Sequence, residues 1–331
     1  MAGGPTTPQL IAAVGAAGGL GSLGAALLAP AAIASAAEAI RGLSNRPFGI
    51  NLFVLPPPDA PAARLRPALE RLAPFHAELG LPPPEVPASF GADPEAQIDA
   101  VLAAAPAVVS THFGPPPPRL LAGCRARGIA VFATATTADE ASALEAAGVD
   151  AIVAQGAEAG GHRGTFLAPS AAAALGTMVL VPAIVDRVGI PVIAAGGIMD
   201  GRGIRAALAL GASAVQMGTA FLACPEAGTH PAHKAALAAD GADTIVTRGV
   251  TGRPARGLRN RLLETLDGDA ERALDYPVQN VLSSGLRGAA ARAGRADLMA
   301  MWAGQAHAQA RAEPAGVLVA RWVREAALDI A

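Results

Sequence analysis

Residues 130–164 read AVFATATTADEASALEAAGVDAIVAQGAEAGGHRG, and this stretch decides the fold. An apolar run at 130–134 is followed by a helical pattern over 138–147 and by a second apolar run at 151–154. Short, continuously apolar runs predict strands that are buried on both faces, and the segment between them predicts a covering helix. This alternation indicates a parallel sheet whose faces carry helices.

The ends of the predicted helices carry recognisable capping signals. Thr137 and Glu140 have the spacing of a capping box, and Gly148 follows the last helical residue. Thr7 and Asp200 each precede a helical pattern and predict two further N-terminal caps. These signals support the helix boundaries independently of the apolar pattern.

The same alternation of short apolar runs with helical patterns predicts seven strands along the chain. They are centred near Ser22, Asn51, Val109, Phe132, Val153, Val192 and Val215. A (β/α)8 barrel has eight strands, and the first regular element here is a helix with no strand before it. The sequence therefore predicts an α/β fold, a (β/α)8 TIM barrel whose first strand is missing from this chain.

The sequence pattern changes after the last predicted strand, and this change predicts a small inserted subdomain. Residues 225–275 combine short helices, charged loops and a strand-like segment at 244–247. We expect residues 1–224 and 276–331 to form the barrel and 225–275 to form an α-rich insertion. The basic run at 253–261 is interpreted as a solvated face.

Composition excludes several classes of protein. With 25 basic and 27 acidic residues the net charge is −2, which indicates neither a nucleic-acid nor an anionic-membrane partner. The apolar stretch 9–37 has no basic residues before it, and glycines interrupt it, so it predicts barrel elements rather than a signal peptide or a membrane span. Cys124 and Cys224 cannot build a disulfide framework. We expect a cytoplasmic protein with a small-molecule substrate, and its oligomeric state is left open.

Glycines follow the last two predicted strands, where barrels commonly bind phosphate. Gly196 and Gly197 come after the strand near Val192, and Gly218 and Thr219 come after the strand near Val215. Backbone N–H groups approach phosphate oxygens where no Cβ intrudes. These two turns therefore predict a phosphate site without any lysine or arginine.

The loop at 155–164 carries the best candidate for chemistry. Gly160 and Gly161 would let a planar ring lie against the backbone. His162 would project from this flexible loop into the mouth of the barrel. His112, at the end of another strand, is an auxiliary candidate. His230 and His233 lack the further ligands of a metal site, so no metal is expected.

Six segments together resemble the nitronate monooxygenase family, also called 2-nitropropane dioxygenases. They are GGLGSLGA (18–25), FGINLFV (48–54), AIVAQGAEAGGHRG (151–164), PVIAAGGIMDGRG (191–203), AVQMGTAFL (214–222) and LMAMWAGQ (298–305). Each segment alone is weak, but the set spans nearly the whole chain. The family fold is a barrel with a small inserted domain, which agrees with the strand count.

The resemblance implies an FMN-dependent enzyme and assigns roles to residues. His162 matches the catalytic histidine, and Asn51 and Gln155 match residues that hydrogen-bond the flavin. The residues matching those that bind the flavin and its phosphate are Gly160, Gly197, Gln216, Met217, Gly218 and Thr219. The implied reaction is oxidation of alkyl nitronates, and of nitroalkanes, by O2 to a carbonyl compound and nitrite.

Two roles for His162 and several other functions stay open at this stage. His162 could stabilise the charge of a nitronate or remove the α-proton of a nitroalkane. A related FMN-dependent NAD(P)H reductase of enoyl thioesters or quinones uses similar loops. An inactive flavin-binding remnant is the non-enzymatic alternative. A barrel related to inosine-monophosphate dehydrogenase would need a cysteine on an active-site loop, and neither Cys124 nor Cys224 lies on one.

The missing strand generates a prediction. Family members begin with a strand resembling PIIQAPMAGG, and residues 1–4 match only its end. Each buried backbone group left unpaired costs about 1–3 kcal/mol. A version extended upstream by about 10–15 residues, one strand and its lead-in, should therefore melt higher and retain more FMN. Equal melting temperatures and flavin contents would show that the strand is either not needed or not missing.

Overall fold

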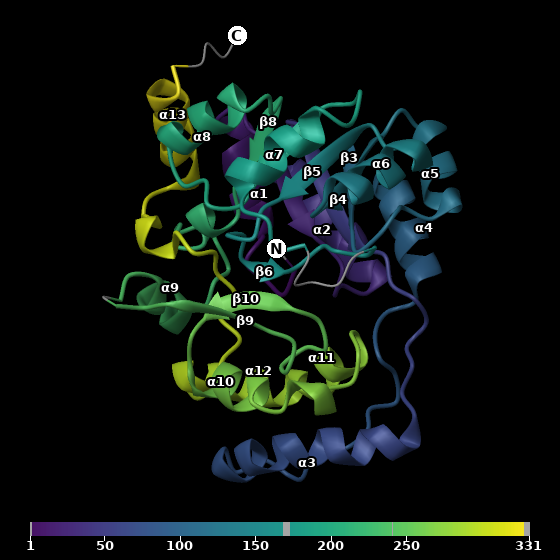
Figure 1. Ribbon diagram of the computed structural model, residues 1–331, viewed down its shortest axis with the longest axis vertical. Helices are drawn as coiled ribbons and strands as arrows, with labels where there is room; N and C mark the ends of the chain where they lie inside the picture. Colours follow the sequence, from purple (N-terminus) through teal and green to yellow (C-terminus); the bar gives the residue numbers. More distant parts are fainter. Residues whose placement is uncertain (1, 168–172, 240, 328–331) are drawn as a thin grey trace.

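The computed structural model describes residues 2–167, 173–239 and 241–327. A seven-stranded, all-parallel sheet organises the larger part of the molecule (Figure 1). Its strands are β1 (Gly21–Gly24), β2 (Phe48–Phe53), β3 (Val108–His112), β4 (Ala130–Ala135), β5 (Ala151–Gln155), β7 (Val192–Ala195) and β8 (Ala214–Gln216). Their spatial order follows the chain, so the seven predicted strands and the barrel-type α/β fold are confirmed.

β1 and β8 form the two edges of this sheet. Ala214 and Gln216 of β8 are exposed, whereas β5, in the interior, is buried at every position. The pairing is regular, with Ile152 beside Val192 and Val153 beside Ile193. This burial explains why the central strands read as uninterrupted apolar runs.

Helices cover the sheet, and all but the first and the last of them connect successive strands. They are α1 (Pro8–Ala16), α2 (Pro30–Leu43), α4 (Pro94–Ala104), α5 (Pro118–Arg125), α6 (Ala138–Ala147), α7 (Thr177–Val185) and α8 (Gly201–Ala209), with α13 (Ala315–Glu325) packing against α1 and α8. The predicted caps are confirmed: Thr7 accepts from the N–H of Leu10, and Asp200 accepts from the N–H groups of Arg202 and Gly203. Among the described helices none has the length and apolar character that crossing a membrane requires.

The predicted capping box at the start of α6 is only half right. Thr137 Oγ1 accepts from the N–H of Glu140, as a capping box requires. The Glu140 carboxylate, however, accepts from Thr136 N–H and Oγ1–H, both at 2.7 Å, and its other oxygen binds the loop after β5. Because this side chain is fully buried, it joins two segments instead of closing one helix.

A second, smaller unit lies below the sheet in Figure 1. It contains an antiparallel sheet of β6 (Gly161–His162), β10 (Ala255–Leu258) and β9 (Thr244–Thr247), in that order. Around it are α3 (Ala62–Glu78), α9 (Pro231–Leu237), α10 (Arg261–Asp267), α11 (Val278–Leu282) and α12 (Ser284–Arg292). Its core includes Leu72 and Phe75 of α3 as well as Leu286 of α12. The division of the chain at residues 225 and 275 stays a prediction.

The sequence also predicts a C-terminal helix over 296–308, and this prediction is wrong. Instead of a helix over 296–308, the chain forms two short 3-10 turns, Ala296–Leu298 and His307–Gln309, with a non-helical segment between them. The N–H groups of Gly304 and Gln305 in this segment donate to Thr219 Oγ1 and to the carbonyl of Glu158. Long-range bonds thus take the donors that a helix would use internally.

Candidate active site

The carboxyl ends of the parallel strands gather the predicted site residues. His112 ends β3, Gln155 ends β5, and Gln216 ends β8. Gly196 follows β7 directly. In sheets of this type ligands bind at the carboxyl ends of the strands, because loops from several strands converge there. The structure therefore brings together at one edge residues that lie about 100 positions apart in sequence.

His162 lies in β6, a two-residue strand that pairs with β10. Its Cα is registered against Ala255, and Gly161 is registered against Arg256. The expectation of a flexible loop is therefore wrong at this position, because the small sheet fixes the backbone of His162. The ring is half-buried, and its Nε2 lies 3.0 Å from Thr251 Oγ1.

The backbone carbonyl of His162 receives two further hydrogen bonds. His112 Nε2 lies 3.1 Å from this oxygen, and Gln155 Nε2 donates to it at 2.9 Å. Gln155 Oε1 in turn accepts from the N–H of Gly164 at 2.8 Å. A carbonyl only accepts, so His112 carries its proton on Nε2. His112 and Gln155 thus hold the backbone on which His162 sits.

Four aromatic side chains surround the His162 ring. Its centroid lies 5.2 Å from Tyr276, 5.7 Å from Trp302, 5.8 Å from Phe113 and 6.1 Å from Phe53. Phe113 has a φ of +79°, a strained conformation for a residue with a side chain, and such strain concentrates at functional sites. We refer to Phe53, Phe113, Tyr276 and Trp302 as the aromatic cage.

The surroundings of His162 keep its ring neutral. Burial is the main cause that lowers the pKa of His162, to about 3, and His112, Arg253 and Arg287 lower it further by charge repulsion. Burial also lowers the pKa of His112, to about 4. Both imidazoles are therefore uncharged at neutral pH, and each has one donor and one acceptor nitrogen.

One buried and two half-buried arginines hold the loop that carries His162. Arg163 donates to the carbonyls of Gly156, Gln155 and Ala173. Arg253 stacks on the Phe113 ring at 3.9 Å and donates to the carbonyl of Thr165, and Arg256 donates to the carbonyl of Ala157. The interpretation of residues 253–261 as a solvated face is therefore wrong for Arg253 and Arg256. It holds for Arg259 and Arg261, which form surface ion pairs.

Glu140 anchors the far end of the same loop. Its Oε1 accepts from Thr165 Oγ1 at 2.9 Å, Phe166 N at 2.6 Å and Leu167 N at 3.1 Å. Burial alone would raise the pKa of Glu140, but these bonds and those from Thr136 lower it, and the net shift is downward. The carboxylate therefore stays charged and fully bonded.

Gly160, in the loop after β5, lies against the backbone of the segment around Gly304. A Cβ added to Gly160 would come within 2.5 Å of the backbone carbon of Ala303 and of the nitrogen of Gly304. The N–H of Gly304 donates to Thr219 Oγ1 at 2.9 Å. The segment around Gly304 therefore lies between the loops after β5 and β8, an arrangement in which only glycine fits.

The glycine turn after β7 has the left-handed backbone that the sequence pattern required. Gly196 has a φ of +116° and Gly197 a φ of +72°. The Glu158 side chain lies 3.4 Å from the position of a Cβ on Gly197, and its carboxylate accepts from the N–H of Thr177. Thr177 Oγ1 lies 2.9 Å from the carbonyl of Gly196. The start of α7 and the loop after β5 thus fix the shape of this turn.

Three predicted residues lie apart from these turns or at their margin. Asn51, within β2, donates from Nδ2 to the carbonyl and hydroxyl oxygens of Ser110 on the neighbouring strand. Gln216 is exposed at the sheet edge, and Met217 packs partly against the main core. The flavin-binding roles expected of these residues stay predictions.

Sequence reasoning missed the residues that surround His162. The chain contains one tyrosine and two tryptophans, and Tyr276 and one of the tryptophans, Trp302, both lie against the His162 ring. Their rarity in so aromatic-poor a chain was a usable signal. Nothing in the local sequence marks Thr251, because its role depends on the pairing of β6 with β10.

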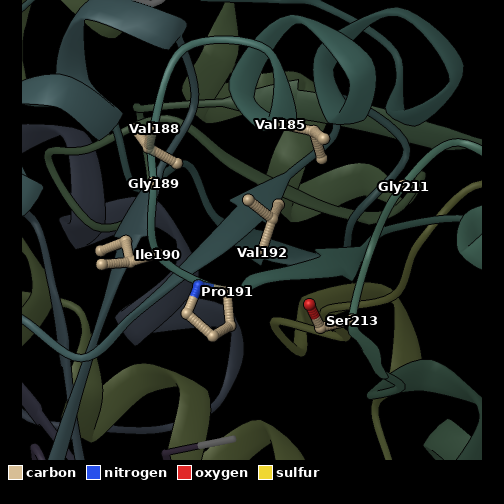
Figure 2. A pocket seen from close by; sticks show the side chains of 8 residues that line it. All are labelled: Val185, Val188, Gly189, Ile190, Pro191, Val192, Gly211 and Ser213. Atoms are coloured by element: carbon tan, nitrogen blue, oxygen red, sulfur yellow. The ribbon is translucent and has the colours of Figure 1, made fainter.

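A cavity of about 270 Å³ lies at the opposite end of the sheet. Figure 2 shows its lining by Val185, Val188, Gly189, Ile190, Pro191, Val192, Gly211 and Ser213. Several of these residues precede β7 or begin it, so the cavity is remote from the carboxyl ends that carry the site. In the described parts of the chain no group of three or more histidine, cysteine or acidic side chains could hold a metal ion.

Comparison with known proteins gives consistent matches along the chain. The family model described as nitronate monooxygenase matches residues 1–325. A nitronate monooxygenase from Pseudomonas aeruginosa is 46% identical over 335 residues, covering 97% of this chain and 93% of that protein. A probable nitronate monooxygenase from Staphylococcus aureus is 39% identical, covering 97% of this chain and 91% of that protein.

Solved structures give the same picture. A nitroalkane oxidase from Streptomyces ansochromogenes has a TM-score of 0.92 and 43% identity, covering 99% of this chain and 94% of that chain. FabK from Thermotoga maritima has a TM-score of 0.74 and 29% identity, covering 99% of this chain and 90% of that chain.

The Glu140 anchor generates a stability prediction. Glu140→Gln turns one accepting oxygen into a donor facing other donors, so the free energy of unfolding should fall by about 2–3 kcal/mol, the scale of bonds to a buried charge. The matched control is Glu145→Gln on the same helix, whose exposed carboxylate accepts one bond from Gly189 N–H. Urea unfolding should separate the two variants, and equal midpoints would contradict the anchoring role.

Proposed function

This chain belongs to the nitronate monooxygenase family, and we propose that it uses bound FMN and O2 to oxidise alkyl nitronates and nitroalkanes to a carbonyl compound and nitrite. The observation that carries the proposal is a neutral histidine, His162, held inside an aromatic cage beside a set of glycine turns. The proposed localisation is cytoplasmic, and the proposed partners are the substrate and O2.

The glycine turns fit the phosphate and ring of FMN. Gly197 has the left-handed backbone that can direct its N–H outward. Thr219 Oγ1 accepts from the N–H of Gly304, and no acceptor in the described part of the chain takes its hydroxyl proton, which can therefore reach a phosphate. A Cβ on Gly161 would meet no atom within 4 Å, so there is open space beside this residue for a planar group. We expect Gly197, Gly218 and Thr219 to hold the phosphate.

When bound, FMN supplies the electron chemistry, and the protein supplies binding and electrostatics. His162 is uncharged, so its contribution is to accept a proton or a hydrogen bond. Arg253 and Arg287, which act on His162 electrostatically, favour a negative charge near the ring. The nitronate formed when a nitroalkane loses its α-proton carries that charge. The nitronate also stabilises the transient imidazolium, because an adjacent anion raises the pKa of a histidine.

The NAD(P)H reductase alternative has weaker support from the structures. FabK is less similar to this chain than the nitroalkane oxidase is, both in TM-score and in identity. An enoyl reductase domain from Bacillus amyloliquefaciens, at 15% identity, shares the fold alone. Nitrite release from a nitroalkane without NADH is the result that separates the two functions.

The phosphate assignment can be tested by substitution at Gly197. Gly197→Ala should cost about 1 kcal/mol in backbone strain at its positive φ, crowd Glu158 and turn the N–H away, so FMN content should fall. Gly128→Ala is the matched control, because Gly128 has a φ of +66°, no atom within 4 Å of an added Cβ, and a position before β4. Flavin absorbance of the purified variants is the measurement. Full occupancy in Gly197→Ala would argue against this phosphate site.

His162→Asn tests the chemical role. Loss of a proton-transfer group lowers turnover by about 10²-fold or more, and FMN content should be unchanged. His230→Asn is the control, because His230 Nδ1 caps α9 and asparagine is also a good cap. Nitrite production with a nitroalkane is the assay. Parental activity in His162→Asn would refute the assignment, and NADH oxidation without nitrite would favour the reductase.

A further inference from the structure

The Thr251 hydroxyl connects His162 to a backbone carbonyl. His162 Nε2 lies 3.0 Å from Thr251 Oγ1, and Thr251 Oγ1 donates to the carbonyl of Arg253 at 3.1 Å. A hydroxyl has one proton, and a carbonyl oxygen can only accept. With both bonds in place, Thr251 donates its only hydroxyl proton to the carbonyl of Arg253, so His162 must donate from Nε2 to Thr251 Oγ1.

We propose that Thr251 is a positioning residue that holds His162 in the tautomer with the proton on Nε2, so that Nδ1 presents its lone pair to the substrate. This assignment rests on the proposed function, since it specifies how His162 serves as the base. Among the described residues none forms a hydrogen bond with His162 Nδ1. That nitrogen is therefore the one available to a bound molecule.

The position of Thr251 is fixed from several sides. Thr251 is fully buried, and the preceding carbonyl, of Val250, accepts from Ser283 Oγ at 2.7 Å. Gly252 follows with a φ of +88°, and a Cβ there would come within 2.2 Å of the carbonyl of Leu274. The turn therefore cannot shift without breaking these contacts, and the hydroxyl has a constant place relative to His162.

The charged groups around His162 favour a neutral ring. Arg253 comes from the turn between β9 and β10 and Arg287 comes from α12, and each lowers the pKa of His162. His112, at the end of β3, is itself neutral at neutral pH and would oppose a charge on His162 only if it were protonated. Tyr276 contacts the ring with a pKa that burial raises to about 12, so it is neutral too. A neutral imidazole has one protonated nitrogen, and the Thr251 bond selects which one.

The tautomer of His162 matters for a nitroalkane, which must lose a proton, and not for a preformed nitronate. For a nitroalkane, the α-C–H bond breaks, the proton goes to Nδ1, and the electron pair moves into the C–N bond and onto the nitro oxygens. With the proton on Nδ1 instead, that nitrogen would be a donor and could not take the α-proton. A preformed nitronate has already lost this proton, so its oxidation does not require the base.

Thr251→Val removes the hydroxyl and keeps the β-branched shape. We expect kcat/KM for a nitroalkane to fall by about 10–10²-fold, with little change for the preformed nitronate. Thr251→Ser, which keeps the hydroxyl, should restore the nitroalkane reaction. Thr247→Val is the control: its hydroxyl is also buried in this region and accepts from Gly249 N–H, but it does not bond His162.

Nitrogen-15 NMR of the protein without substrate provides a readout that does not depend on turnover. The parent should show His162 with a protonated Nε2 and an unprotonated Nδ1, and Thr251→Val should show a mixture of tautomers. A protonated Nδ1 in the parent would overturn the proposal, as would an equal loss with nitroalkane and nitronate in Thr251→Val, or the same loss in Thr247→Val. If the parent oxidises neither substrate, the proposed function fails, whereas the NMR result still decides the tautomer.

Discussion

The site depends on one short backbone pairing. The two residues of β6 join the loop after β5 to β10, and through β10 to the smaller unit. Without this pairing only side-chain hydrogen bonds, such as those of His112, Gln155 and Arg163, would hold the glycine-rich loop that carries His162. With it, the ring meets Tyr276 and Trp302, which come from the C-terminal part of the chain. The end of the sheet that carries the candidate site is therefore completed by a second structural unit.

Buried and half-buried charges stabilise the loop and also set the electrostatics of the site. Arg163, Arg253 and Arg256 bind carbonyls of the loop after β5, and Glu140 binds N–H groups at the loop's far end. Burying unpaired ions is costly, so each is surrounded by hydrogen-bond partners. The net result near His162 is cationic, which favours an uncharged ring and an anionic reaction partner. The groups that anchor the loop are thus also the groups that set the electrostatics around His162.

The fold was predictable to a large extent because strands buried on both faces have a local signature. All seven strands, the caps at Thr7 and Asp200 and the glycine turn after β7 follow from short-range pattern. The errors fall where distant segments compete for the same groups. The segment around Gly304 is non-helical because its N–H groups bind loops far away in sequence. The Glu140 carboxylate binds Thr136 with one oxygen and the loop near Phe166 with the other, instead of the Thr137 N–H that a capping box uses.

The sequence by itself determined the type of sheet, the strand order along the chain and the glycines at the carboxyl ends of the strands. It also indicated His162 as the candidate histidine for the chemistry. These features depend on apolar periodicity and on the backbone freedom of glycine, which are local properties. Only the tertiary structure decided that the ring is caged and neutral, and that Thr251 contacts its Nε2. Those facts depend on which segments meet in space, and burial, aromatic contact and the direction of a hydrogen bond exist only after they have met.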